Sequence, residues 1–179
     1  MSDTLSVREI QPQDIELITN YWLNAEDAFL LGMGVDLAKM LTKDQWIEML
    51  SQQVAQPYNE KKSYCTIWEV NGKAVGHSNV NKITFGLEAY LHLHMWDSSI
   101  RSKGYGLQLV KLSLAYFFKN LKLKTLYCEP YALNPAPNKT LEKLGFRFVK
   151  EYKTIPGMLN FEQPVNLWEL TQESFLKLQ

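Results

Sequence analysis

The segment from residue 87 to residue 132 carries the pattern that most constrains how this chain can fold. Apolar and polar residues alternate over LEAYLHLHMW (87–96), as in a strand with one buried face. After RSKGYG (101–106), apolar residues recur on one face of a helix, at Leu107, Val110, Leu114, Phe117 and Leu121. KTLYCEPYA (124–132) then reads as a second strand. A strand, a helix and a strand in this order favour a local parallel strand pair.

Two further helices are expected near the beginning of the sequence. LSVREI (5–10) alternates like a short strand, and DIELITNYWLNA (14–25) has helical spacing with Asp14 as its cap. TKDQWIEMLSQQVAQ (42–56) predicts a second helix that begins after Thr42.

The middle of the chain is rich in predicted strands. SYCTIWEV (63–70) and KAVGHSNVNKI (73–83) flank Asn71 and Gly72, a dipeptide that strongly favours a two-residue hairpin turn. These two strands and the one at 87–96 would form an antiparallel meander.

A short helix and two strands follow the central unit. NKTLEKL (138–144) reads as a helix that ends at Gly145, and FRFVKEYKTI (146–155) and VNLWELTQ (165–172) read as strands. We therefore predict one α+β domain over residues 1–179, with a mixed, mostly antiparallel sheet of about six to seven strands flanked by helices.

The charge balance and the apolar content exclude several classes of protein. Nineteen basic and nineteen acidic residues give a formal net charge of zero, which argues against a nonspecific nucleic-acid binder. The first fourteen residues contain no apolar signal region, and no run of about 18 apolar residues occurs. We expect no membrane span, no nucleic-acid partner and a cytoplasmic location.

The sequence RSKGYG has the composition of an anion site. A helix that begins near Gly104 presents unpaired backbone N–H groups and a partial positive charge, and glycines let a bound group approach the backbone. Arg101 and Lys103 add positive charge at the same place. Together these features suit a phosphate or pyrophosphate. The alternative is a turn with two solvated basic side chains.

Two common nucleotide loops do not match this sequence. The nucleoside-triphosphate loop requires Gly-x4-Gly-Lys-Ser/Thr, which does not occur in the chain. The dinucleotide-binding loop requires a third glycine where Leu109 stands.

The context of RSKGYG resembles the GCN5-related N-acetyltransferase (GNAT) superfamily. That superfamily carries Arg/Gln-x-x-Gly-x-Gly/Ala between its fourth strand and the following helix. The ribosomal-protein-type (RimJ/RimL-like) branch is most similar, because NPAPNKTLEKLGF (134–146) has Asn134 and the Glu-Lys-Leu-Gly-Phe run in phase. The resemblance is specific over about residues 87–150. It implies the GNAT fold, with central strands that splay apart.

The resemblance implies acetyl-CoA as the acetyl donor. The loop amides would hold the CoA pyrophosphate, the backbone at 94–96 would pair with the pantetheine arm, and Asn134 would contact the arm from the far side. The predicted cofactor-binding residues are His94, Met95, Trp96, Arg101, Ser102, Lys103, Gly104, Tyr105, Gly106 and Asn134.

Two departures from the family pattern concern the chemistry. Pro137 stands where the family has a serine, and Leu141 stands where many members carry the tyrosine that serves as general acid. The group that reprotonates the departing thiolate is therefore not identified by the motif.

Two residues are candidates for the base that takes a proton from the attacking amine. His92 can accept a proton at neutral pH, and it lies nine positions before Arg101, where arylalkylamine acetyltransferases of this superfamily carry one of two relay histidines. The position of the other is Tyr90 here. Glu129, late in the predicted strand before Asn134, is the second candidate. The alternative for His92 is simple packing in the sheet.

The three histidines, His77, His92 and His94, are spaced so that they could in principle bind zinc. No carboxylate or cysteine completes a ligand set, and we expect no metal.

The acceptor is the least constrained part of the prediction. In this family the segments matching 22–40 and 152–166 shape the acceptor cleft, and here they contain aromatic residues interspersed with Glu26, Asp27 and Asp36. We expect a small amine or a peptide N-terminus as acceptor, and a monomer or a homodimer. The alternatives are a noncatalytic acyl-CoA-binding module of the same fold and an unrelated α+β interaction domain.

Overall fold

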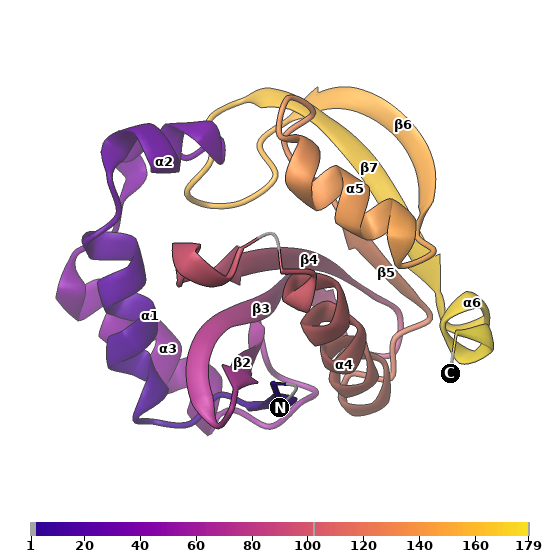
Figure 1. Cartoon of the computed structure of the whole chain (residues 1–179), viewed down its shortest axis with the longest axis horizontal. Helices are drawn as coiled ribbons and strands as arrows, with labels where there is room; N and C mark the ends of the chain where they lie inside the picture. The colour runs from indigo at the N-terminus through magenta and orange to yellow at the C-terminus, as the bar shows by residue number, and fades with distance from the viewer. Residues whose placement is uncertain (1–2, 102, 179) are drawn as a thin grey trace.

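The computed structural model describes residues 3–101 and 103–178. One seven-stranded sheet runs through them in the order β1-β2-β3-β4-β5-β7-β6 (Figure 1). Neighbouring strands are antiparallel except for β4 and β5, which are parallel. The predicted mixed, mostly antiparallel sheet and the predicted parallel pair are confirmed. The strands are β1 (Leu5–Glu9), β2 (Tyr64–Val70), β3 (Lys73–Thr84), β4 (Glu88–Met95), β5 (Thr125–Cys128), β6 (Arg147–Thr154) and β7 (Gln163–Thr171).

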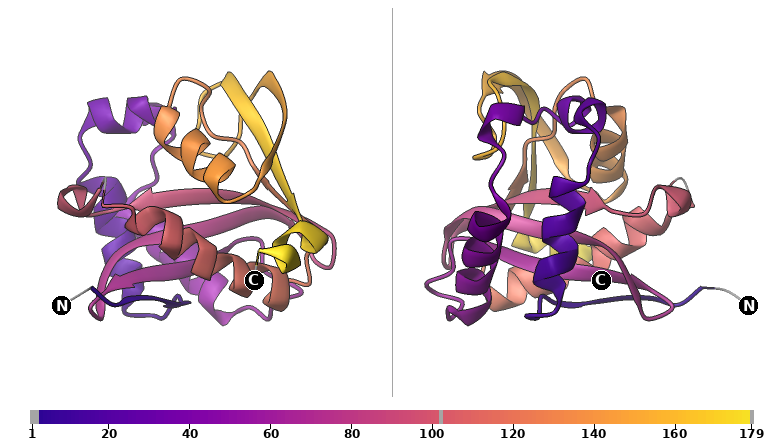
Figure 2. Two further views of the ribbon diagram at one scale, coloured as in Figure 1. Left: turned by 45° about the vertical axis from the view of Figure 1, so that its right-hand side comes forward. Right: turned by 90° about the vertical axis from the view of Figure 1, so that its left-hand side faces the viewer.

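The helices lie in two layers on the faces of the sheet. Figures 1 and 2 show α1 and α3 beside β2 and β3, while α4 crosses the opposite face. Separate buried clusters of apolar side chains lie under each layer. The helices are α1 (Asp14–Leu23), α2 (Asp27–Gly32), α3 (Lys43–Ala55), α4 (Tyr105–Asn120), α5 (Pro135–Lys143) and α6 (Gln172–Lys177), with short 3-10 turns η1 (Leu37–Lys39) and η2 (Ser98–Ile100). None of these helices in the described residues is both long and apolar enough to cross a membrane.

Local signals account for several of these boundaries. Thr42 caps α3 in a reciprocal pair of hydrogen bonds with Gln45, and Asn71 and Gly72 take the positive φ values of the expected hairpin turn. The prediction that Asp14 caps α1 is wrong, because Gln13 holds the cap position. The Asp14 carboxylate instead pairs with Arg8.

The C-terminal end of the chain differs from the strand pattern expected from the sequence. VNLWELTQ was expected to close the chain as a strand, yet α6 follows β7 at once. Thr171 caps α6 by accepting the backbone N–H of Ser174, so the side-chain hydroxyl ends the strand and begins the helix.

β4 and β5 separate after Leu91, which is halfway along β4. Their pairing runs from Glu88 with Thr125 to Leu91 with Cys128, and there β5 ends while β4 continues to Met95. Pro130 has no backbone N–H, so the chain after Cys128 cannot extend the ladder for long. The splay expected between the central strands is therefore present, and it opens on the N-terminal end of α4.

Candidate active site

The free edge of β4 faces the opening between the splayed strands. Trp96 donates its backbone N–H to the Val75 carbonyl at 2.8 Å, so its main chain is directed toward β3. Backbone direction alternates along a strand. Leu93 and Met95 therefore direct their main-chain groups into the opening, whereas His94 and Trp96 direct theirs toward β3. Of the three residues predicted to pair with a pantetheine arm, only Met95 has its own backbone on that side.

The loop before α4 has the backbone shape expected of an anion site. Gly104 is the N-cap of this 16-residue helix with φ +79°, and a Cβ placed on it would meet no atom within 4 Å. Glycine has no side chain to cap the first turn, so the amides of that turn are directed outward. Lys103 is exposed beside it. Ser102, also predicted to contact the cofactor, lies outside the described residues.

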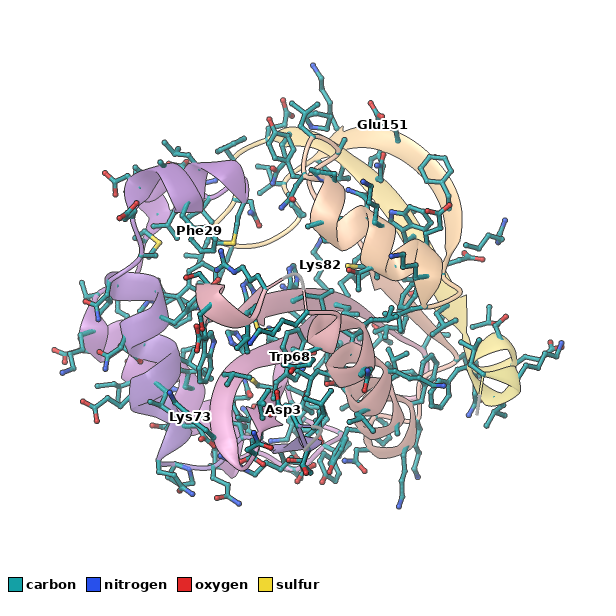
Figure 3. All side chains as sticks on the ribbon, viewed as in Figure 1. Asp3, Phe29, Trp68, Lys73, Lys82 and Glu151 are labelled. Carbon is teal, nitrogen blue, oxygen red and sulfur yellow. The ribbon has the colours of Figure 1, made fainter. Side chains whose placement is uncertain are left out.

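Arg101 and Tyr105 are engaged within the protein. Arg101 donates from Nη2 to the Met95 carbonyl at 2.9 Å, and its guanidinium lies 4.7 Å from the ring centre of Phe29. Phe29 lies on α2 and is labelled in Figure 3. Tyr105 donates its hydroxyl to the Asp3 carboxylate. Arg101 therefore ties the end of β4 to α2. None of these contacts involves Lys103, the other basic residue of the loop.

A cavity of about 220 Å³ lies on the α1 and α3 face of the sheet and reaches the opening. Its walls come from α1, α3, β3, β4, the segment after β5 and the loop between β6 and β7. That loop is fastened over the cavity, because Asp36 donates its backbone N–H to Leu159 at 2.7 Å and Asn160 donates from Nδ2 to Gly34 at 2.9 Å. Figure 2 shows this loop approaching the α2 region.

Two of the histidines on this face form a stacked pair. His77 of β3 and His94 of β4 are register partners with ring centres 4.6 Å apart. Trp96 donates its indole N–H to Nδ1 of His77 at 2.7 Å, and the Tyr21 hydroxyl lies 3.3 Å from Nδ1 of His94. Burial lowers the pKa of His77 to about 3 and that of His94 well below its usual value, so both rings are neutral near pH 7. No group of three or more potential ligands in the described parts of the chain is arranged to hold a metal.

His92 is the histidine nearest to the predicted chemistry. It lines the cavity, and its Nε2 atom is buried without a hydrogen-bond partner among the described residues. A Cβ built on Gly157, in the loop between β6 and β7, would lie 3.7 Å from its Cε1. Burial, and then the charge of Lys82, lower the His92 pKa to about 4. The ring is therefore neutral near pH 7.

Glu129 lines the same cavity and is held by two partners. Its carboxylate accepts the Tyr152 hydroxyl and pairs with Lys82 at 3.3 Å. Lys82 has φ +47° at a bulge in β3, and its ammonium lies 4.6 Å from the ring centre of Tyr90. Figure 3 places Lys82 between β4 and α5. Lys82 was not predicted, and Tyr152 was expected only as part of the acceptor-cleft segment 152–166. Their contacts with Glu129 could not be predicted because they join segments far apart in the sequence.

The segment around Asn134 is shaped by an amide that sequence reading overlooked. Asn138 donates from Nδ2 to the carbonyls of Tyr131 and Asn134 and accepts from Asn166 and Trp168 through Oδ1. These bonds hold Asn134 at the start of α5, where it lines the cavity. The sequence feature that could have pointed to Asn138 is its position directly after Pro137.

The structure brings only part of the predicted site to the cavity. Of the predicted residues, His92, His94, Glu129 and Asn134 line it, whereas Arg101 and residues 103–106 lie at the N-terminal end of α4. Gly106 lies beside the end of β4, since a Cβ there would lie 3.9 Å from Cε of Met95. Leu141, at the family tyrosine position, is completely buried in the core under α4. The acidic residues Glu26, Asp27 and Asp36 do not line the cavity.

Comparison with known proteins identifies the family. A sequence model of the acetyltransferase (GNAT) domain matches residues 4–147. A search of curated proteins gives no match. Among solved structures, spermidine N-acetyltransferase from Vibrio cholerae in complex with CoA and spermine is 17% identical, covering 96% of this chain and 98% of that chain, with a TM-score of 0.77. RimL, a ribosomal L7/L12 alpha-N-protein acetyltransferase in complex with coenzyme A, is 13% identical over 96% of both chains, with a TM-score of 0.76.

These matches agree with the splayed strands, the glycine-containing loop and the helix that follows it. The structural likenesses, at this identity, establish the shared fold. The family model covers well over half of the sequence, and the superfamily predicted from RSKGYG and its context is confirmed. This chain belongs to the GNAT acetyltransferase family.

Proposed function

We propose that the protein transfers an acetyl group from acetyl-CoA to a primary amine. One observation carries this proposal: the opening between β4 and β5 has the glycine loop of α4 at one end and a lined cavity with a neutral, unpaired imidazole at the other. A long donor and a small acceptor could thus meet between the two strands.

The residues present fit the donor. The outward amides of the first turn of α4 and the side chain of Lys103 would bind the pyrophosphate, and the space beside Gly104 leaves room for it. The main-chain groups of Leu93 would pair with the amides of the pantetheine arm. At Met95 the carbonyl is already bonded to Arg101, so its N–H is the group available there.

Bound acetyl-CoA would supply a thioester that an amine attacks directly, so the protein need not provide a nucleophile. His92 would accept the amine proton through its unpaired Nε2. Both carboxylate oxygens of Glu129 are already bonded, to Tyr152 and Lys82, which makes Glu129 the poorer base. We infer that the Glu129 carboxylate instead neutralises the Lys82 ammonium beside His92.

The second candidate function is a noncatalytic acyl-CoA-binding module. It is favoured by one observation: Leu141, which has no proton to give, is packed in the core where many family members carry the acid. Binding of the donor without turnover would be the sign of this function.

The acceptor class proposed is a small amine or a peptide N-terminus. The neighbours of similar fold are named for spermidine and for the N-terminus of a ribosomal protein, so both kinds of acceptor occur on this fold. Cys65 and Cys128 are free and buried, which supports a reducing, cytoplasmic compartment.

Thermal shift with CoA followed by a thiol-release assay tests the proposal. We expect CoA to raise the melting temperature and free thiol to appear only when an amine is added to acetyl-CoA. A shift without thiol release for any amine would establish the binding module instead. No shift with CoA or acetyl-CoA would contradict both functions.

A further inference from the structure

One edge of the sheet is uncovered, and it belongs to β6. In the described parts of the chain β6 pairs with β7 alone, most of its residues are exposed, and Figure 1 shows it along the outer rim. The opposite edge strand, β1, is half-buried throughout, and its Val7 carbonyl accepts the Tyr116 hydroxyl of α4 at 2.9 Å. An uncovered strand edge presents backbone N–H and C=O groups that another strand can bond.

The hydrogen bonds of β7 show which main-chain groups of β6 face outward. Asn166 donates its backbone N–H, and Pro164 offers its carbonyl, to the segment after β5, at 3.1 and 2.9 Å. Both residues therefore direct their main chain away from β6. Their register partners on β6 are Glu151 and Lys153. Opposed residues of an antiparallel ladder either bond each other or both face away, so the main-chain groups of Glu151 and Lys153 face outward from the sheet.

The charges of these two residues distinguish the ways in which β6 can pair with a second copy of itself. A twofold axis normal to the sheet brings two copies of β6 edge to edge as antiparallel strands. Three registers then bond the outward groups: Glu151 with its own copy, Lys153 with its own copy, or Glu151 with Lys153 of the second copy. The first two oppose like charges, which destabilises a strand pair, whereas the third opposes unlike charges on both sides of the axis.

Both charged side chains are available for this pairing. Glu151 and Lys153 are exposed, and the ion pairs found among residues 3–101 and 103–178 involve neither of them. Figure 3 places Glu151 at the outer rim of the molecule. Val149 and Ile155, which are 37% and 50% exposed, flank this segment, and the second copy would cover part of their surface.

The regular part of this edge is short. A register shift interrupts β6 between Phe148 and Lys150, and the strand ends at Thr154. Bulges and lysines on an edge strand ordinarily limit pairing between strands, so this edge does not favour open-ended association. A twofold contact uses each β6 edge once and closes the assembly, and an interface of this size belongs to a weak, reversible dimer.

We propose that β6 is a homodimer interface in which residues 150–154 of two copies pair antiparallel about a twofold axis at Tyr152, with Glu151 opposite Lys153 of the other copy. The two sheets would then form one continuous sheet. The Tyr152 hydroxyl also bonds Glu129 at the cavity, so the axis passes beside the strand that borders each candidate active site. This inference is independent of the proposed function, because it depends on the sheet edge and its charges alone.

Sedimentation equilibrium over a series of protein concentrations tests the interface. We expect wild-type protein to show a monomer–dimer equilibrium. Lys153→Glu opposes like charges in both pairs, so the dissociation constant should rise at least about tenfold. Glu151→Lys combined with Lys153→Glu restores unlike charges with their signs exchanged, and the dissociation constant should return to within about threefold of the wild-type value.

Lys150→Glu is the matched control for the single reversal. Lys150 is exposed on the same strand, and its reversal changes the net charge by the same amount. In the proposed register it would lie opposite the neutral Thr154 of the second copy, so the dissociation constant should change by less than about threefold.

Amide hydrogen exchange of the wild-type protein tests the same interface without a substitution. The outward N–H groups of Glu151 and Lys153 would be bonded only in the dimer, so their exchange should slow as the protein concentration rises. The Tyr152 N–H, directed toward β7, should show little dependence on concentration.

A monomer at every concentration, or exchange at Glu151 and Lys153 that does not depend on concentration, would overturn the proposal. A dimer that Lys153→Glu leaves unchanged would overturn this interface, and failure of the double variant to restore dimerisation would overturn the register. The exchange measurement decides the question even if a variant does not fold. None of these outcomes depends on whether the protein transfers an acetyl group.

Discussion

The two faces of the sheet differ in how fully their buried polar groups are hydrogen-bonded. On the α4 face, Ser113 donates its hydroxyl to the Leu109 carbonyl at 2.9 Å and is also bonded to Thr66, Trp68 and Ser78. On the α1 and α3 face lie the cavity and the buried polar atoms without partners. On the first face, which we call the closed face, no buried side-chain polar atom of residues 3–101 and 103–178 lacks a hydrogen-bond partner. The second, the open face, has hydrogen-bonding capacity left for a ligand.

This difference separates the residues that maintain the fold from those that bind and react. Changes on the closed face should alter the free energy of unfolding and leave ligand affinity intact. Changes at the cavity or at the loop before α4 should mainly alter ligand affinity or turnover. The following variants test that division.

The largest effect is expected from Gly104→Val. A side chain at this position would occupy the space beside the first turn of α4, so we expect CoA affinity to fall at least about a hundredfold by calorimetry. The positive φ adds a folding cost of about 1–2 kcal/mol.

Gly86→Val is the matched control for that variant. Gly86 has φ +77° and equally open surroundings, but it lies in the turn between β3 and β4, at the C-terminal end of α4. It should be destabilised to a similar degree and bind CoA normally. Wild-type CoA affinity in Gly104→Val would contradict the assignment of the loop.

His92→Ala tests the proposed base on the open face. We expect kcat to fall about a hundredfold while CoA affinity stays within about twofold, because general-base catalysis contributes roughly that much to a rate. An unaltered kcat and pH–rate profile would remove His92 from the mechanism.

The closed face is tested by Ser113→Ala. Loss of this fully buried hydroxyl removes the hydrogen-bond partner of the Thr66 hydroxyl and one donor to the Leu109 carbonyl. The free energy of unfolding should therefore fall by about 1–3 kcal/mol. Denaturant unfolding would measure it, with exposed Ser51→Ala as the control. A loss of CoA affinity without a loss of stability would reverse the roles assigned to the two faces.

The buried imidazole of His77 predicts a dependence of stability on pH. Its folded pKa, about 3, is below the unfolded value of about 6.5, so the unfolded state binds more protons between these values. The stabilising contribution is complete above about pH 6.5 and is lost as pH falls toward 3, by up to about 1.4 kcal/mol per unit. His77→Gln should flatten the measured slope. An identical slope in the variant would show that His77 does not govern it.

The smallest effect is expected from Asn81→Leu on the open face. This change removes the unpaired Oδ1 and preserves the approximate shape of the side chain, so stability should change by less than about 0.5 kcal/mol. A loss of 2 kcal/mol or more would mean that the Asn81 amide serves the fold.

Local patterns predicted the fold well where neighbouring residues determine it. The Asn71-Gly72 hairpin, the cap at Thr42 and the strand-helix-strand unit after residue 87 each depend on a short stretch, and each was found. Alternation also placed His92 and His94 on one face. The strand register, which pairs His77 with His94, depends on the whole sheet and could not be read from the sequence.

The candidate site was only partly predictable for the same reason. The bonds of Glu129 to Tyr152 and Lys82 join segments distant in sequence, and Lys82 reaches its partner from a bulge. Arg101 was expected to face the phosphate, yet it bonds to the Met95 carbonyl because that carbonyl lies on the free edge of β4. Such contacts follow from tertiary structure, which no local motif specifies.

The central claim is that the donor binds along the free edge of β4 and the loop before α4. Amide chemical-shift mapping during a CoA titration tests it most directly. We expect the largest changes at Leu93, Met95, Lys103 to Gly106 and Asn134, with little change around Ser113. Changes concentrated on the closed face, or no changes at saturating CoA, would contradict it.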